Sequence, residues 1–259
     1  ATALCGMNGR YIEMDYQETQ MYGDVMAMVK KQLNDFTLDV AIGGSINDRI
    51  TNSTRIDSKN ASLKYANVFN LANIVMSSSA SIDQKIDAHY QLQSVFATAQ
   101  IGYKEGVFLD LTARNDWSST LAYTKYEKKG FFYPSVGVSF LPDKWVKMPE
   151  WVSFSKLRGA YSIVGNGVPP FITYPVSYVT AGGEILASDA APFAEMKPEM
   201  THSVELGMEW KFLQHRLGLN LTYYRTDTYE QFFKLPALAG DKYAYRYVNA
   251  GDIRNQGWE

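Results

Sequence analysis

Apolar and polar side chains alternate along several segments of about ten residues. One such segment, 36–43, places four apolar residues on one parity: Phe36, Leu38, Val40 and Ile42. Alternation with a period of two predicts a strand with one apolar face. The clearest pair of segments, 94–103 and 107–116, is joined by a three-residue turn, Lys104-Glu105-Gly106. This pattern predicts a β-hairpin.

Short turns and long polar connections follow one another along the chain. Short turns are predicted at 34–35, 104–106 and 214–215, and long connections at 46–88, 117–130 and 166–200. Short turns at one end of a sheet and long loops at the other are typical of an outer-membrane β-barrel, whose short turns face the periplasm. We find no crossover helix of the βαβ type, which argues against a parallel α/β fold. The predicted fold is all-β, an antiparallel transmembrane β-barrel.

Three regions give a weaker signal. Residues 1–20 resemble the tail of a loop. Residues 22–33 favour a strand, although their Met, Ala, Lys and Gln content is also compatible with a helix. The long connection at 46–88 contains an apolar patch, 63–76, that we expect to form a short helix or to pack over the barrel mouth.

In several of the predicted strands, charged side chains keep to the parity opposite the apolar one. A charge on the lipid-facing side of a barrel costs several kcal/mol near the midplane, so this parity is predicted to line an aqueous lumen. The residues concerned are Asp39, Asp110, Arg114, Asp116, Arg158, Glu205 and Glu209.

Composition narrows the choice of function. The 259 residues are 46% hydrophobic and carry a formal net charge of −2, which argues against a nucleic-acid-binding protein. Aromatic residues reach 14%, a content that suits the girdles of a membrane barrel or the stacking surfaces of a sugar-binding sandwich. Five loop aromatics are candidates for contact with a substrate: Trp117, Tyr123, Tyr126, Phe131 and Phe132.

Residues with obvious chemistry are sparse. The sequence has no HExxH, GxSxG, P-loop or GxGxxG motif, and no cofactor or metal site is predicted. Cys5 is the only cysteine, so there is no disulfide framework. Asp110 and Asp116 lie about 20 Å apart by strand rise, too far to act as an acid–base pair. The sequence does not predict an enzyme.

A set of ordered motifs resembles the SusC/RagA-type TonB-dependent transporters. The motifs are RNDWSS, YPSVGVSF, LRGAYSIVGN, KPEMTHSVELGMEW and NAGDIRNQGWE, and the match extends from about Phe36 onward. The departures are small. Ala160 stands where the family often has Ser, and Met208-Glu209 where it often has Leu-Asp, and neither change disturbs strand parity.

The resemblance implies a 22-stranded barrel with an N-terminal plug domain and a TonB box. It implies import of oligosaccharides or peptides across the outer membrane of a Gram-negative bacterium of the Bacteroidota type. It also implies a SusD-like lipoprotein as an extracellular lid, energy from the TonB complex, and contact of the seven charged residues with the plug. Residues 1–259 would be the central portion of the barrel, surrounded by outer-membrane lipid. Both ends look like cuts, because no signal peptide opens the chain and NQGWE stops where a strand begins.

Two other functions compete with transport. A soluble all-β carbohydrate-binding protein would share the alternation and the aromatics, but it does not readily explain long loops gathered at one end of the strands. An outer-membrane hydrolase is the weaker alternative, because the sequence shows no nucleophile–base arrangement.

Overall fold

The computed structural model describes residues 6–75, 81–179 and 185–259. Cys5 lies outside the described residues. Almost all regular structure is β-strand, and the elements in chain order are β1 (Ile12–Leu33), β2 (Phe36–Asp57), η1 (Leu71–Asn73), β3 (Ser81–Tyr103), β4 (Val107–Ser118), η2 (Ser119–Leu121), β5 (Phe131–Phe140), η3 (Pro142–Lys144), β6 (Val152–Asn166), β7 (Tyr178–Val179), β8 (Ile185–Leu186), β9 (Glu199–Phe212), β10 (Leu217–Tyr229), β11 (Phe232–Pro236), β12 (Tyr245–Asn249) and β13 (Ile253–Trp258).

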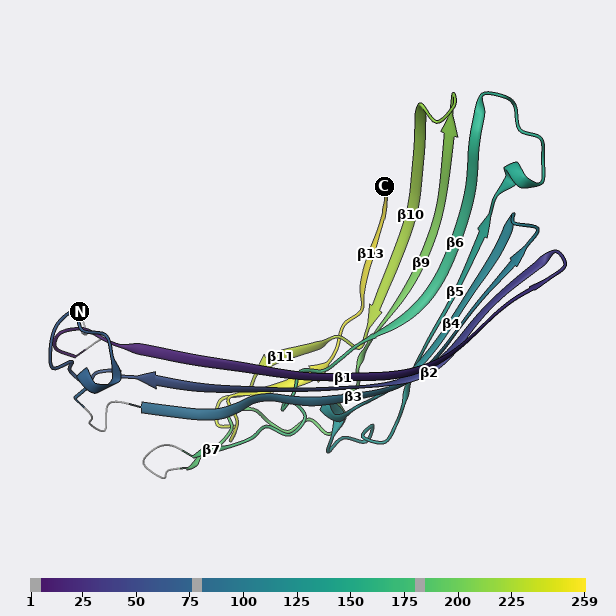
Figure 1. Cartoon of the computed structure of the whole chain (residues 1–259). Helices are drawn as coiled ribbons and strands as arrows, with labels where there is room; N and C mark the ends of the chain where they lie inside the picture. Colours follow the sequence, from purple (N-terminus) through teal and green to yellow (C-terminus); the bar gives the residue numbers. More distant parts are fainter. Residues whose placement is uncertain (1–5, 76–80, 180–184) are drawn as a thin grey trace.

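Nine strands form one curved antiparallel sheet (Figure 1). Their order is β1-β2-β3-β4-β5-β6-β9-β10-β13, and each neighbour is the next of these strands along the chain. The remaining strands form two small hairpins, β7–β8 and β11–β12, inserted in the long connections. The prediction of an all-antiparallel β fold is confirmed.

The register gives the sheet one apolar and one polar face. Leu38, Ile101, Leu109 and Val138 lie side by side on four successive strands. Their neighbours along the strands, such as Asp39, Gln100 and Asp110, form the opposite face. Many large side chains of the apolar face are exposed, among them Val25, Val95, Val138, Leu206, Leu217 and Leu219. A continuous exposed apolar face needs lipid or another apolar cover rather than water.

The short turns occur where the sequence predicts them. Leu33 pairs with Phe36 around a two-residue turn in which Asn34 has a φ of 51°. The turn after Tyr103 contains Lys104 and Glu105, both with positive φ. Gln214 and His215 occupy the turn between β9 and β10. These turns lie at one end of the sheet, together with an aromatic group that includes Tyr103 and Trp145, whose ring centroids are 5.5 Å apart.

The first three strands are much longer than the sequence pattern predicts. The prediction that residues 1–20 form a loop is wrong for 12–20, which belong to β1, and residues 22–33 are strand rather than helix. The predicted connection at 46–88 is also wrong in its bounds, because β2 continues to Asp57 and β3 starts at Ser81. We call residues 12–22, 47–57 and 81–92 the extension; in Figure 1 they reach far beyond the neighbouring strands.

The extension lacks the one-sided charge pattern. Adjacent residues Asp48 and Arg49 place a charge on each face of β2. Asp48 lies 3.4 Å from His89, and Arg49 pairs with Glu18. A strand that is wet on both faces keeps its ladder of backbone hydrogen bonds but loses the period of two in hydropathy. The sequence signal for these strand halves was therefore weak.

A small folded unit closes the far end of the extension. We call residues 6–11 and 58–75 the tip. Ala61, Leu63 and Ile74 form its buried cluster. Asn73 organises the loop, because its side chain accepts a hydrogen bond from the Tyr65 N–H and donates to the Tyr65 and Val68 carbonyls. The apolar patch thus contains the short helical turn η1 and packs within the tip.

Asp57 joins the tip to the strands. Its carboxylate is only 2% exposed and accepts two hydrogen bonds from Arg10, at 2.9 and 2.8 Å. Arg55 and the Lys59 N–H donate to the same carboxylate, each at 2.8 Å. The Arg10 guanidinium, with help from Lys59 and Arg55, lowers the pKa of Asp57 to about 2, against the opposing effect of burial.

Candidate functional site

The seven charged residues predicted to line a lumen all lie on the polar face of the sheet. Asp39, Gln100 and Asp110 form one row across β2, β3 and β4, and Glu205 lies in the same row on β9. Arg158 occupies the next row toward the short turns, and Arg114 and Asp116 occupy rows toward the long loops. Glu209 faces Lys156 on β6.

Partners on the same strand or on a neighbouring one balance most of these charges. Lys30 pairs with Asp39 at 2.7 Å, and the Gln100 side chain donates to Asp110 at 2.6 Å. Arg114 donates to Asp116 and to Ser94, both at 2.7 Å. Further pairs join Arg158 to Glu205 at 3.0 Å and Lys211 to Glu209 at 3.3 Å. The result is a hydrated, charge-balanced surface with no single dominant sign, which is suited to contact with polar cargo or another polar protein surface.

A glycine makes room for one of these side chains. Arg158 lies across Gly207 on the adjacent strand, where a Cβ would collide with the guanidinium arm. From this position the Arg158 Nη2 group also reaches the Thr222 hydroxyl of β10 at 2.9 Å. The missing side chain at Gly207 therefore lets one arginine bridge three strands.

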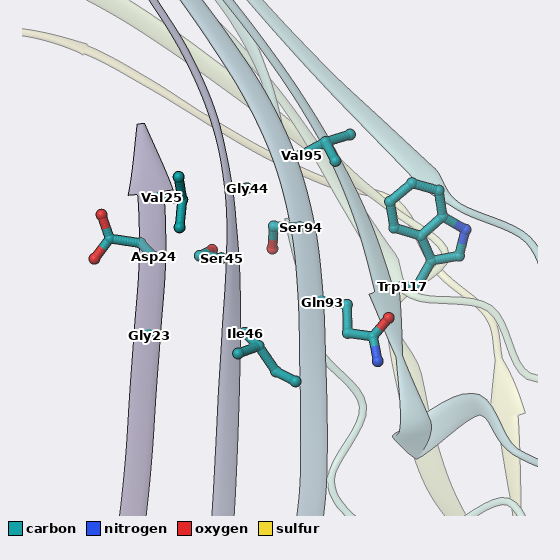
Figure 2. Close-up of a pocket in the computed structure, with 10 residues that line it drawn as sticks. All are labelled: Gly23, Asp24, Val25, Gly44, Ser45, Ile46, Gln93, Ser94, Val95 and Trp117. Atoms are coloured by element: carbon teal, nitrogen blue, oxygen red, sulfur yellow. The ribbon is translucent and has the colours of Figure 1, made fainter. Parts of the chain in front are cut away.

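The opposite face carries a shallow groove near the start of the extension (Figure 2). Gly23 and Gly44 leave it open, and Val25, Val95 and Trp117 are among its lining residues. Its volume is about 560 Å³. Trp117 pairs with Gln93 and shares the parity of Leu109 and Leu111. This position favours an interfacial girdle role for Trp117 over contact with a substrate.

The other candidate aromatics occupy different surroundings. Phe132 lies on the apolar parity, opposite Asn115, and is largely exposed. Tyr126 and Phe131 pack against a buried loop cluster formed by Leu121, Val168 and Met196. This cluster joins the connections that follow β4 and β6, and Phe232 of β11 also packs against it. Packing therefore accounts for the positions of Tyr126 and Phe131.

Tyr123 is the candidate whose side chain remains most available. It is 70% exposed, and its ring lies 4.9 Å from that of Tyr174, which is also exposed. The backbone φ of Tyr123 is +63°, an unusual value for a bulky side chain, and the Glu127 carboxylate accepts a hydrogen bond from its N–H. Such strained positions cluster at binding sites. Tyr174 was missed by the sequence reasoning because only the folded loops bring it next to Tyr123.

One asparagine of the C-terminal motif fastens the long loops together. The Asn249 side chain donates to the carbonyls of Lys197 and Glu230, at 3.0 and 2.7 Å, and accepts from the Lys197 N–H. Lys197 also pairs with Glu230 at 2.6 Å. The first Asn of NAGDIRNQGWE, Asn249, thus has a structural role, because it joins the segments before β9, after β10 and before β13.

Reactive groups are not assembled in the described part of the chain. Over residues 6–75, 81–179 and 185–259, no three His, Cys, Asp or Glu side chains gather closely enough to hold a metal ion. The same residues contain no helix long and apolar enough to cross a membrane. Asp110 and Asp116 bond to separate partners, Gln100 and Arg114.

Comparison with known proteins identifies the class. Residues 6–259 match the family described as "TonB dependent receptor-like, beta-barrel". The chain therefore belongs to this family, and its sheet is part of an outer-membrane β-barrel. This result favours the barrel over the soluble sandwich, and it confirms the class indicated by the motifs.

Individual relatives agree with this assignment. The chain is 26% identical, over 179 residues, to "TonB-dependent receptor P3" of Formosa agariphila, covering 65% of this chain and 18% of the relative. Its fold is similar to the RagAB peptide importer in the 'closed-closed' state, with a TM-score of 0.79 and 18% identity, over 95% of this chain and 28% of that one. A more distant likeness is the outer membrane transporter YddB from Escherichia coli, with a TM-score of 0.59, 11% identity and coverage of 95% and 30%.

The chain spans less than a third of the length of these relatives. The nine-stranded sheet is accordingly open, and its outer strands β1 and β13 each have one neighbour in it. A barrel in lipid must close so that no strand edge stays unpaired.

Proposed function

We propose that this chain forms the central portion of the barrel of a TonB-dependent importer, which takes up oligosaccharides or peptides through the outer membrane. The observation that carries the proposal is the division of the sheet into a charge-balanced polar face and an exposed apolar face. In a closed barrel the polar face surrounds the lumen and meets a plug domain, and the apolar face meets lipid. Membership of the TonB dependent receptor-like family supports the same reading.

The extracellular loops are proposed to meet cargo through the pair Tyr123–Tyr174. Exposed aromatic rings can stack on sugar faces or on apolar peptide side chains. A SusD-like lipoprotein is the partner proposed for the loop side. The likeness to a protein described as a peptide importer makes peptides worth testing beside oligosaccharides.

Uptake by cells tests the function. Cells that carry or lack the full-length gene are supplied with labelled oligosaccharides and labelled oligopeptides, with and without a working TonB complex. The proposal expects uptake of one class that needs both the gene and TonB. Equal uptake by the deletion strain for every compound offered would contradict it.

The double variant Tyr123→Ala/Tyr174→Ala tests the loop pair. We expect cargo affinity to fall by roughly 5-fold to 150-fold, because each stacking ring contributes about 0.5–1.5 kcal/mol. Tyr65→Ala is the matched control, since Tyr65 is similarly exposed but belongs to the tip. Unchanged affinity in the double variant would remove the pair from the site.

A further inference from the structure

Two arginines stand on the apolar face, at the extracellular end of β10 and β13. Arg225 and Asp227 follow Leu217, Leu219, Leu221 and Tyr223 on the same parity of β10. Arg254 pairs with Asp227 across the strands, so it lies on the same face. These charges therefore break the rule that confines charge to the polar face.

The level of the arginines coincides with the expected membrane boundary. Strand β10 runs from a short turn at Leu217 to a long loop after Tyr229, so its end is the extracellular one. Tyr223 and Trp258 face each other just before the arginines, with ring centroids 5.0 Å apart. Arg225 lies about 7 Å beyond this aromatic pair by strand rise. Aromatic rings followed by cations mark the headgroup region of a bilayer.

Asp227 holds the two guanidinium groups side by side. The Nε groups of Arg225 and Arg254 donate to its two carboxylate oxygens, at 2.8 and 2.5 Å. Only the Nε group of each arginine takes part in these two bonds, which leaves the Nη groups as donors for a further acceptor. Arg225 and Arg254 are 40% and 54% exposed, whereas Asp227 is 14% exposed. Paired guanidinium forks of this kind match the oxygens of a phosphate.

An apolar groove lies directly beside this cluster, toward the membrane. It has a volume of about 510 Å³. Arg158 and Gly207 line it beside six apolar residues: Leu157, Leu206, Met208, Leu221, Tyr223 and Trp258. All six residues belong to the apolar parity of four adjacent strands. A cationic cluster above an apolar groove has the two features of a lipid site: one part for a charged headgroup and one for an acyl chain.

We propose that Arg225 and Arg254 bind the phosphate of a lipid in the outer leaflet, and that the neighbouring groove holds one of its acyl chains. Phosphorylated glycolipids of the lipid A type fit this chemistry, because they carry phosphate and pack in the leaflet that faces the long loops. The two arginines and the six apolar residues lie on the lipid side of the sheet, opposite the proposed transport surface.

Lipid A retention by the purified full-length protein tests the proposal. The protein is exchanged into micelles of lipid A and phosphatidylethanolamine, and bound lipid is counted by native mass spectrometry. We expect Arg225→Gln/Arg254→Gln to weaken retention by on the order of 30-fold, from roughly 5-fold for each arginine. Arg216→Gln is the matched control, because Arg216 lies in the short turn at the other end of β10. Its retention should equal that of the unaltered protein.

Two further arms keep the test decisive. Folding of each variant is checked by its heat-dependent gel shift. Arg225→Lys/Arg254→Lys should bind lipid A more tightly than the Gln variant and more weakly than the unaltered protein, because lysine keeps the charge but lacks the guanidinium fork. With the unaltered protein, lipid A from which phosphate has been removed should bind no better than phosphatidylethanolamine. Equal binding of phosphorylated and dephosphorylated lipid would overturn the proposal. Complete release of lipid A by excess inorganic phosphate would also overturn it, by showing a site for the anion alone.

Discussion

The membrane-spanning part of the sheet is the nine-stranded sheet without the extension. In β1, β2 and β3 the two parts belong to the same strands, but their patterns of apolar and polar residues differ. From Phe36 to Ile46, strand β2 alternates apolar and polar residues, whereas from Asn47 to Asp57 both faces carry polar or charged side chains. The backbone pairing continues across the boundary, with one irregularity between Thr51 and Asn52. Backbone hydrogen bonding therefore sets where a strand exists, and the surrounding solvent sets which residues it carries.

The two parts are also stabilised differently. The spanning part has little buried apolar core of its own, and its apolar side chains face outward. The extension ends in the tip, where a buried apolar cluster and the Asp57 carboxylate tie residues 6–11 to the loop after β2. We therefore expect the spanning part to respond to changes on its lipid face, and the extension to respond to changes at its tip.

The largest contrast should come from arginine on the apolar parity. Leu111→Arg, near the middle of β4, is expected to destabilise the folded barrel by about 2–4 kcal/mol, because it places a charge near the bilayer midplane. Met21→Arg puts the same charge on the extension opposite Asp48 and should change stability by less than about 0.5 kcal/mol. Unfolding of the full-length protein from lipid vesicles by guanidinium measures both. Equal losses of stability in the two variants would contradict a lipid boundary between the spanning part and the extension.

Removing the buried charge at the tip should produce the next largest effect. Asp57→Asn is expected to cost the tip about 1–3 kcal/mol of local stability, since Arg10 and Arg55 lose their shared carboxylate. Hydrogen exchange of residues 58–75 should rise, while exchange in β4 and β9 stays the same. The control is Asp15→Asn, an exposed carboxylate on β1. Faster exchange throughout the sheet would show that tip and spanning part are one cooperative unit.

Acid should open the tip before it affects the spanning part. The folded pKa of Asp57, about 2, lies below the usual value of an unfolded aspartate, about 3.9. The carboxylate therefore stabilises the folded tip fully above about pH 4, and this contribution of at most about 2.6 kcal/mol is lost as pH falls toward 2. Exchange at residues 58–75 followed from pH 5 downward checks the sign. In Asp57→Asn the same pH dependence should be absent.

The smallest expected effect concerns the loops at the extracellular end of the spanning part. Asn249→Ala removes the hydrogen bonds that join the Lys197 and Glu230 segments, at a cost of about 1 kcal/mol. Limited proteolysis between β11 and β12 should become faster, and Asn220→Ala on β10 should have no such effect. If the two variants are cleaved at the same rate, Asn249 does not fasten the loops.

Sequence reasoning worked where solvent differs between the two faces of a strand. The strict alternation around Phe36–Ile42 and Val107–Ala113 located strands, parity and short turns. It failed for residues 12–20 and 47–57, because strands with water on both sides have no hydropathy period. Parity alone put the seven charged residues on one face, in agreement with the register of the sheet, and their position in a lumen stays a prediction. The roles of Tyr174 and Asp57 arise from contacts between distant segments, so no local sequence pattern predicts them.

Depth-resolved spin labelling along β3 can locate the boundary between the membrane-spanning part and the extension. Single cysteines for labelling are placed at successive positions from 82 to 103 in the full-length protein, and collisions with oxygen and with a water-soluble nickel complex are compared in lipid. We predict that lipid exposure alternates with a period of two from 94 to 103, with Val95, Ala97, Ala99 and Ile101 on the lipid side. From 82 to 92 every label should meet water. Alternation that continues through the extension, or its absence from 94–103, would show that the lipid boundary does not lie between the two parts of β3.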